Sequence, residues 1–167
     1  MNWIALAFIT AGTLMRFLPH PFNMTPIVAL AIFSGRRFSM RFALALTLGT
    51  MLIGDVALGW VPQNLMGYLS LAAAVVLGAY LRNRKTVAWI PVLGAAVSSS
   101  LIFFLLSNFG VWLEGRLYPL TGQGLVSCYV AAVPFYKNQL FGDLLYTAVL
   151  FGGFQCVCSK KPALSHP

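Results

Sequence analysis

Charged residues are scarce in this chain of 167 residues. They make up 8% of the sequence, against roughly 25% in ordinary soluble domains, and only three of them are acidic. Apolar residues, in contrast, make up 59%. This composition excludes an ordinary soluble domain and is typical of an integral membrane protein, in which apolar helices of about 20 residues use most of the chain.

Catalytic and disulfide patterns are also missing. The sequence contains no Gly-x-Ser-x-Gly, no His-Glu-x-x-His and no phosphate loop, and its three cysteines, an odd number, make no disulfide framework. The N-terminus has neither a basic segment nor a cleavage site, so we expect a first membrane span there and not a signal peptide. We therefore expect a protein that is not an enzyme and that has no bound cofactor.

The basic residues that are present lie mainly in three clusters, at positions 36–41, 82–85 and 160–161. Because basic residues of short loops stay on the cytoplasmic side, the apolar stretches between the clusters must cross the membrane and return. This topology explains the net charge of +8 without nucleic acid as a partner, since no basic stripe with interleaved aromatics lies on a soluble face. The lipid bilayer is the partner that the composition indicates.

We predict an all-α integral membrane protein, a bundle of six transmembrane helices with both termini in the cytoplasm, located in the bacterial inner membrane. It forms a single domain, 1–167, and ends in a short cytoplasmic tail, 159–167. The second span is the doubtful one, because its fourteen residues cover about 21 Å of a hydrocarbon core of about 30 Å. The predicted spans are residues 3–18, 22–35, 42–60, 65–81, 87–113 and 138–158.

On this topology the unusual polar residues gather toward the outer face. Arg16, His20 and Asn23 follow the first span, while Asp55, Asn108 and Asp143 lie in the outer parts of the third, fifth and sixth. An aspartate at the centre of a membrane helix costs about 2.5–3.5 kcal/mol, so neither Asp55 nor Asp143 should face lipid. Two interpretations stay open: each aspartate pairs with Arg16 or caps a helix, or the two line a ligand pocket.

Two further side chains have an ordinary and a functional interpretation. His20, held between Pro19 and Pro21, is a plain loop residue or a ligand for a transition metal through its imidazole. Cys128, in the predicted outer loop 114–137, is an inert thiol or a soft metal ligand. The two are too few and too far apart in sequence to make a recognisable zinc site.

Several of these features together resemble the substrate-binding S component of energy-coupling-factor vitamin transporters. The shared features are six spans, cytoplasmic termini, polar outer loops and an Ala-x-x-x-Ala on the first helix, here Ala7 and Ala11. The segments 21–26, 54–55, 107–112 and 124–135 also resemble an uncharacterised bacterial membrane family near that superfamily.

The resemblance implies a mechanism. Ala7 and Ala11 would dock on an energy-coupling membrane subunit with its ATPases, unless the protein acts alone. The loops 16–25, 61–64 and 114–137 would close over the ligand. If the ligand is a corrinoid, Cys128 would coordinate its cobalt.

The hypothesis is therefore a membrane protein that captures a small, vitamin-like micronutrient, for example a corrinoid, at the outer face and delivers it inward. Polar side chains would contact the substrate and aromatic side chains would form apolar walls. The alternative is a scaffold of a cell-envelope complex that transports nothing. The predicted substrate-binding residues are Arg16, His20, Asn23, Asp55, Asn108, Trp112, Tyr129, Phe135 and Asp143.

Overall fold

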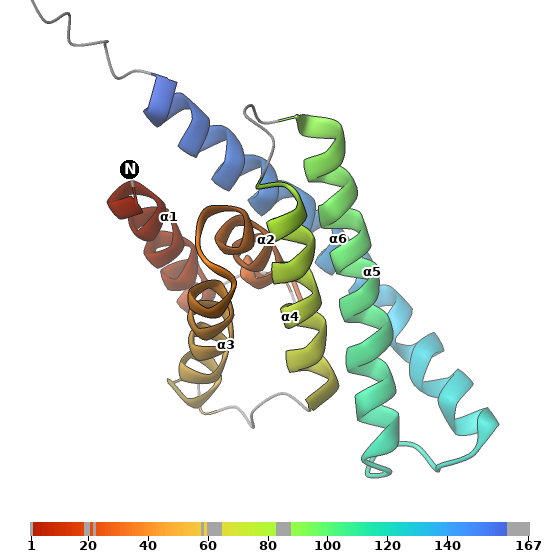
Figure 1. Cartoon of the computed structure of the whole chain (residues 1–167). Helices are drawn as coiled ribbons and strands as arrows, with labels where there is room; N and C mark the ends of the chain where they lie inside the picture. The colour runs from red at the N-terminus through yellow and green to blue at the C-terminus, as the bar shows by residue number, and fades with distance from the viewer. Residues whose placement is uncertain are drawn as a thin grey trace, which may run out of the picture.

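The computed structural model describes residues 2–18, 21, 23–57, 59, 65–82 and 88–159, and within these residues the chain is helical and has no strand. Figure 1 shows the helices gathered into one bundle, with the long α6 crossing behind the others. The elements are α1 (Asn2–Leu14), the 3-10 helix η1 (Met15–Phe17), α2 (Ile27–Arg37), α3 (Met40–Ala57), α4 (Leu65–Tyr80), α5 (Trp89–Leu113) and α6 (Gly122–Ser159).

Each of the six stretches that the sequence predicts as a span overlaps one of these helices, and two boundaries differ by more than a few residues. The second helix begins at Ile27, directly after Pro26, and has only 11 residues. The last helix begins at Gly122, so that residues 122–137, which we expected in an outer loop, are helical. The local reason is an N-terminal cap, since the Gly124 N–H donates to Thr121 Oγ1 at 3.1 Å.

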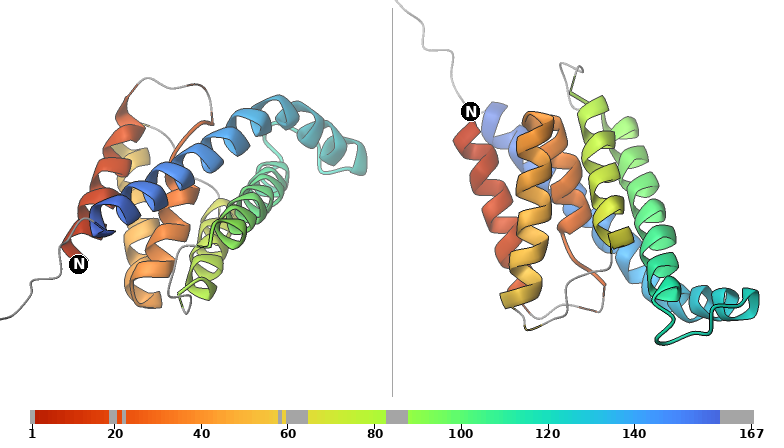
Figure 2. Two further views of the ribbon diagram at one scale, coloured as in Figure 1. Left: turned by 90° about the horizontal axis from the view of Figure 1, so that it is seen from above. Right: turned by 60° about the horizontal axis from the view of Figure 1, so that its bottom comes forward.

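Helix α6 is bent. Figure 2 shows its first part, drawn in teal, turned away from the line of the remainder. The helix contains Pro134 in its interior. Proline has no N–H to donate and its ring crowds the carbonyl four residues earlier, which is a common cause of helix kinks. The bend keeps the first part of α6 against α5 while the remainder passes over α2.

Helix α2 is the centre of the bundle. It contacts α1, α3, α4, α5 and α6, and every residue from Ile27 to Arg36 is buried. A helix that is apolar on all sides, as most of α2 is, belongs inside a larger assembly of helices and not at its surface. The neighbouring helices therefore separate the short α2 from the surroundings of the protein.

The closest helix packing is between α2 and α4. A Cβ atom added to Gly35 would lie 2.1 Å from the carbonyl oxygen of Val75, and one added to Gly78 would lie 2.1 Å from that of Ile32. Ala74, one turn before Gly78, is completely buried. Small residues at this spacing let two helix backbones approach, so Ala74 and Gly78 serve the packing of the protein's own bundle.

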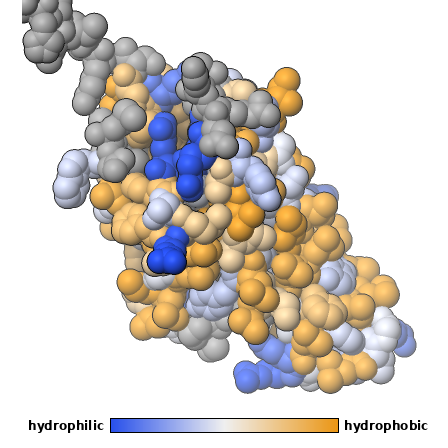
Figure 3. Space-filling model, in the orientation of Figure 1, coloured by the Kyte–Doolittle hydropathy of each residue, from blue (hydrophilic) through white to orange (hydrophobic). Residues whose placement is uncertain are grey.

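Among the helices that the structure describes, three are long and apolar enough to cross a membrane: α3, α5 and α6, the last over Gly122–Cys158. Helix α4 is apolar as well but has 16 residues. Large apolar side chains such as Ile53, Ile90 and Phe141 are exposed on the outside of the bundle. Figure 3 shows a molecular face that is mostly hydrophobic, as expected of helices that meet lipid.

Candidate functional site

A line of polar side chains is buried between α5 and α6. Gln139 of α6 donates from Nε2 to the carbonyl oxygen of Ser100 at 2.8 Å and contacts Ser100 Oγ at 3.1 Å. Asp143, one turn further along α6, accepts hydrogen bonds from the side chains of Ser100 and Gln139. Its side chain is only 1% exposed. The carboxyl group thus lies inside the bundle, held in one orientation by two neutral neighbours.

This line contains polar atoms whose hydrogen-bonding capacity is not used. Within the described part of the chain, Asp143 Oδ2, Ser99 Oγ and Thr147 Oγ1 are buried without a hydrogen-bond partner. A buried polar group without a partner costs about 1–3 kcal/mol, and more if it is charged. Asp143 and Thr147 lie one turn apart on α6, and Ser99 is next to Ser100 on α5, so these unused acceptors are suited to a ligand that supplies hydrogen-bond donors.

The segment that leads into α2 passes close to this line. A Cβ atom added to Gly142 would lie 2.8 Å from Met24 Cγ and 3.1 Å from Met24 Cα, so only glycine fits between α6 and this segment. Asn23, beside Met24, is exposed and has a φ of 61°, a left-handed conformation that asparagine tolerates. The fold therefore brings Asn23 and Asp143, two of the predicted binding residues, into the same neighbourhood.

Other predicted residues lie where the end of α5 meets the start of α6, next to the loop that connects the two helices. The Cys128 thiol donates to the Asn108 carbonyl at 3.4 Å, the Tyr129 hydroxyl donates to the Leu105 carbonyl at 2.7 Å, and Trp112 Nε1 donates to the Pro119 carbonyl at 3.0 Å. Asn108 Nδ2 donates within its own helix, to Phe104. In this conformation the side chains of Trp112, Cys128 and Tyr129 hold the hairpin together.

Cys128 is only 2% exposed, so its sulfur does not lie on an open surface. A role as a cobalt ligand would need the two helices to separate. Within the residues that the structure describes, no group of three or more histidine, cysteine and acidic side chains lies close enough to hold a metal ion.

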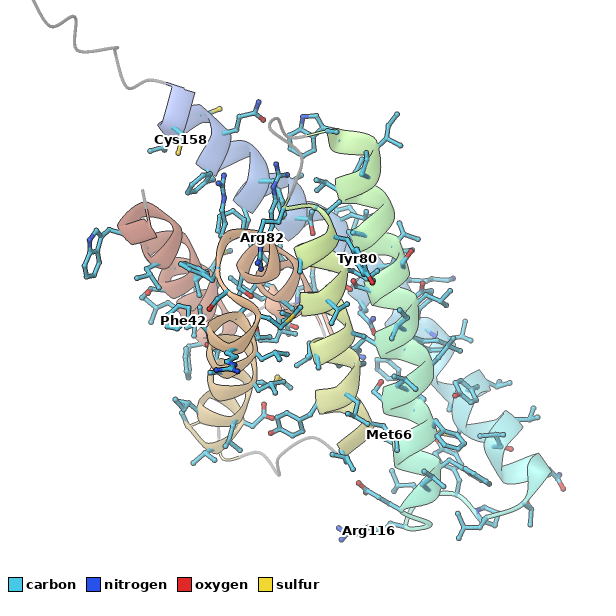
Figure 4. All side chains as sticks on the ribbon, viewed as in Figure 1. Phe42, Met66, Tyr80, Arg82, Arg116 and Cys158 are labelled. Carbon is cyan, nitrogen blue, oxygen red and sulfur yellow. The ribbon has the colours of Figure 1, made fainter. Side chains whose placement is uncertain are left out.

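An apolar cavity of about 330 Å³ opens between the start of α4 and the end of α5. It is lined by Leu65, Met66, Gly110, Leu113 and Glu114, none of which is among the predicted binding residues. Figure 4 shows Met66 at the beginning of α4, facing α5. The cavity lies next to the turn of α5 that carries Asn108 and Trp112.

The remaining predicted residues are dispersed. Asp55 is 1% exposed and lies on α3, which packs against α2. Asp143 lies on α6, so the two aspartates belong to different helix pairs. Phe135 is 44% exposed on α6. The backbone of Arg16 lies in η1, but its side chain is outside the described part, as are His20 and the loop 61–64.

Sequence reasoning missed the buried polar residues that accompany Asp143 on α5 and α6. They are Ser99, Ser100, Gln139 and Thr147. One signal was present, because Gln139, Asp143 and Thr147 follow each other at intervals of four residues. That spacing places polar side chains on one face of a helix, and in an apolar helix such a face should pack inward.

No curated protein and no solved structure matches the chain. A family model does match, over residues 1–164, and it carries the description "Family of unknown function (DUF6580)". The match extends over almost the whole sequence, and the chain therefore belongs to the DUF6580 family.

Proposed function

We propose that this protein is a multi-pass protein of the bacterial cytoplasmic membrane that binds a small micronutrient and carries it inward. The observation that supports this function best is Asp143, a carboxyl group buried in an apolar helix with one oxygen left without a partner among the described residues. Ionisable side chains inside membrane helices are rare and generally mark substrate or ion pathways.

The chemistry of the site limits the substrate class. Ser100 and Gln139 orient the carboxyl group, while Asp143 Oδ2, Ser99 Oγ and Thr147 Oγ1 have unused capacity to accept hydrogen bonds. A solute with an amine, amide or hydroxyl group would satisfy these acceptors, and a positively charged solute would also neutralise the carboxylate. The proposed substrate therefore carries hydrogen-bond donors.

The buried position of α2 makes it compatible with the second of the six proposed crossings, although the helix is short. Its 11 residues extend about 16 Å, which is too short for the hydrocarbon core of about 30 Å. Non-helical backbone is tolerated at membrane depth where protein covers it, and α2 is covered by its neighbours. In our proposal the segment 23–26 completes the second crossing beside α6 and Asp143.

The exposed face of α1 supports the proposal that a coupling subunit drives uptake. Ala7 and Ala11 are exposed, unlike Ala74 and Gly78, which are buried against α2. Small residues that are not buried against another helix of the same chain leave a flat surface, on which a helix of another membrane subunit can pack.

The test is native mass spectrometry, with an absorption spectrum, on protein purified gently from its own host. A bound small molecule that is lost in Ser100→Ala but retained in Ser98→Ala would support the function and the site, because Ser98 is exposed on the same helix while Ser100 is buried. Corrinoid absorption would identify that substrate and make Cys128 its candidate ligand. A protein that carries nothing and ignores a panel of vitamins would favour the scaffold.

A further inference from the structure

We propose that the basic end of the molecule, formed by Arg36, Arg37 and Arg82, binds a phosphate group, and that an anionic phospholipid supplies it. The three side chains come together from two helices. Arg36 and Arg37 form the last turn of α2, and Arg82 directly follows α4. Arg82 Nη2 donates to the carbonyl oxygen of Gly35 at 2.8 Å and also to that of Phe38.

Helix α6 fixes the two arginines of α2. The guanidinium carbon of Arg36 lies 5.8 Å from the ring centre of Phe151, and that of Arg37 lies 3.9 Å from the ring centre of Phe154. Both rings meet Phe33 edge-on, at 5.3 and 5.4 Å between ring centres. This aromatic platform holds the guanidinium groups in place by cation–π contact before any anion arrives.

The acidic side chains of this protein lie elsewhere in the fold. The whole sequence has three acidic residues, Asp55, Glu114 and Asp143, against 11 lysines and arginines. Asp143 lies about 16 Å along α6 from Phe154. Asp55 lies about 22 Å along α3 from the first residue of that helix, which comes shortly after the end of α2. Glu114 follows the far end of α5. The carboxylates of this protein therefore lie away from the basic end, where the exposed Arg82 and the partly exposed Arg37 can meet an external anion.

Arg37 has hydrogen-bonding capacity that the protein does not use. Its side chain is partly exposed, and its Nε atom is buried without a hydrogen-bond partner in the described part of the chain. A buried charge is costly unless it is paired and hydrogen-bonded. Phosphate oxygens are suited to this role, because the N–H groups of a guanidinium match them in geometry and in charge.

The position of the basic end favours a lipid as the source of the phosphate. It lies at one end of a bundle whose outer surface is mostly apolar, and Figure 3 shows hydrophilic residues gathered toward that end. Trp89 begins α5 at the same level, with its ring next to Gly152 of α6, and tryptophan is typical of the boundary between hydrocarbon and headgroups. Basic pockets between membrane helices commonly bind anionic headgroups.

The experiment compares lipids on the full chain in detergent, with bound lipid counted by native mass spectrometry. We expect phosphatidylglycerol to bind more tightly than phosphatidylcholine, and Arg37→Gln to weaken phosphatidylglycerol binding by about tenfold or more, as the loss of a charged hydrogen bond does. Arg37→Lys, which keeps the charge but not the planar fork, should give a smaller loss. Circular dichroism checks that both variants are folded.

The matched control is Arg116→Gln, which removes one exposed positive charge at the opposite end of the molecule (Figure 4) and should leave lipid binding unchanged. Equal affinity for the two lipids, or full binding by Arg37→Gln, would overturn the site. Displacement of phosphatidylglycerol by millimolar inorganic phosphate would retain the phosphate site and overturn the lipid as its occupant. The site shares no residue with the Asp143 site, so either can fail alone.

Discussion

At the scale of single residues, Asp143 combines a structural cost with the functional use that we propose for it. Its side chain is 1% exposed and one carboxylate oxygen has no partner among the described residues. Thr13, in contrast, is satisfied in place by the carbonyl of Ile9 at 2.9 Å. A buried polar group without a partner needs an explanation, and ligand binding is the one that we propose for Asp143.

The first prediction follows from that contrast. Asp143→Asn keeps the shape of the side chain but removes its charge, so substrate binding should fall by about tenfold or more while the melting temperature stays equal or rises. Ligand retention in native mass spectrometry and a thermal melt in detergent measure the two effects. A variant that melts lower yet keeps its ligand would identify Asp143 as a structural residue and end the site assignment.

At the scale of elements, the contact of α2 with α4 depends on two glycines. Gly78→Ala would place a methyl group 2.1 Å from the Ile32 carbonyl oxygen, so the helices must separate. We predict a loss of about 1–3 kcal/mol, the usual cost of overpacking a core. Gly49→Ala is the control, because nothing lies within 4 Å of its added Cβ atom, and helix propensity should stabilise it by up to about 1 kcal/mol. Thermal melts of both variants test the difference; equal destabilisation would contradict it.

The helices themselves were largely predictable from sequence, because long apolar stretches between polar breaks can hardly form anything else in lipid. The start of α6 was not. Residues 122–137 contain prolines, glycines and polar residues that suggested a loop, but the Thr121 cap and the contacts of Tyr129 and Cys128 with α5 stabilise a helix there. Tertiary contacts of this kind are not visible in local composition.

The candidate site was predictable only in part, for a related reason. Asp143 stands out in any sequence because a charge in an apolar stretch is rare. Its neighbours do not, since serines in membrane helices usually bond to their own backbone. Which polar residues meet depends on the rotation of α5 against α6, and the bend at Pro134 influences that rotation. The pairing of Ser100 with Gln139 therefore appears only in the structure.

At the scale of the whole molecule, the distribution of charge agrees with the order of the helices. The three basic clusters were predicted to share one side of the membrane. In the structure Arg82 contacts the end of α2, and Arg37 lies close to Cys158, near the end of α6. Residues of the first two clusters and Cys158, which lies close to the third, are therefore at the same end of the molecule. Figure 4 shows this end around Arg82 and Cys158, with Arg116 far from both.

The last prediction concerns the orientation of this arrangement in the membrane. Helix α5 has 25 residues and extends about 37 Å, enough to place its two ends on opposite sides of a core of about 30 Å. Arg116→Cys, just after α5, should therefore react with a membrane-impermeant maleimide in intact cells. The exposed Cys156, near the basic end, should react only after the membrane is permeabilised.

Each cysteine is tested in a variant whose other cysteines are replaced by alanine, because Cys158 is partly exposed while Cys128 is buried. The positive-inside rule places the basic end in the cytoplasm, where anionic lipid headgroups also concentrate. Labelling of Cys156 from outside would invert the topology and place Arg36, Arg37 and Arg82 at the wrong leaflet for the proposed lipid. Labelling of both positions from one side would mean that α6, which separates them in the chain, does not cross, and the uptake mechanism would lose its pathway.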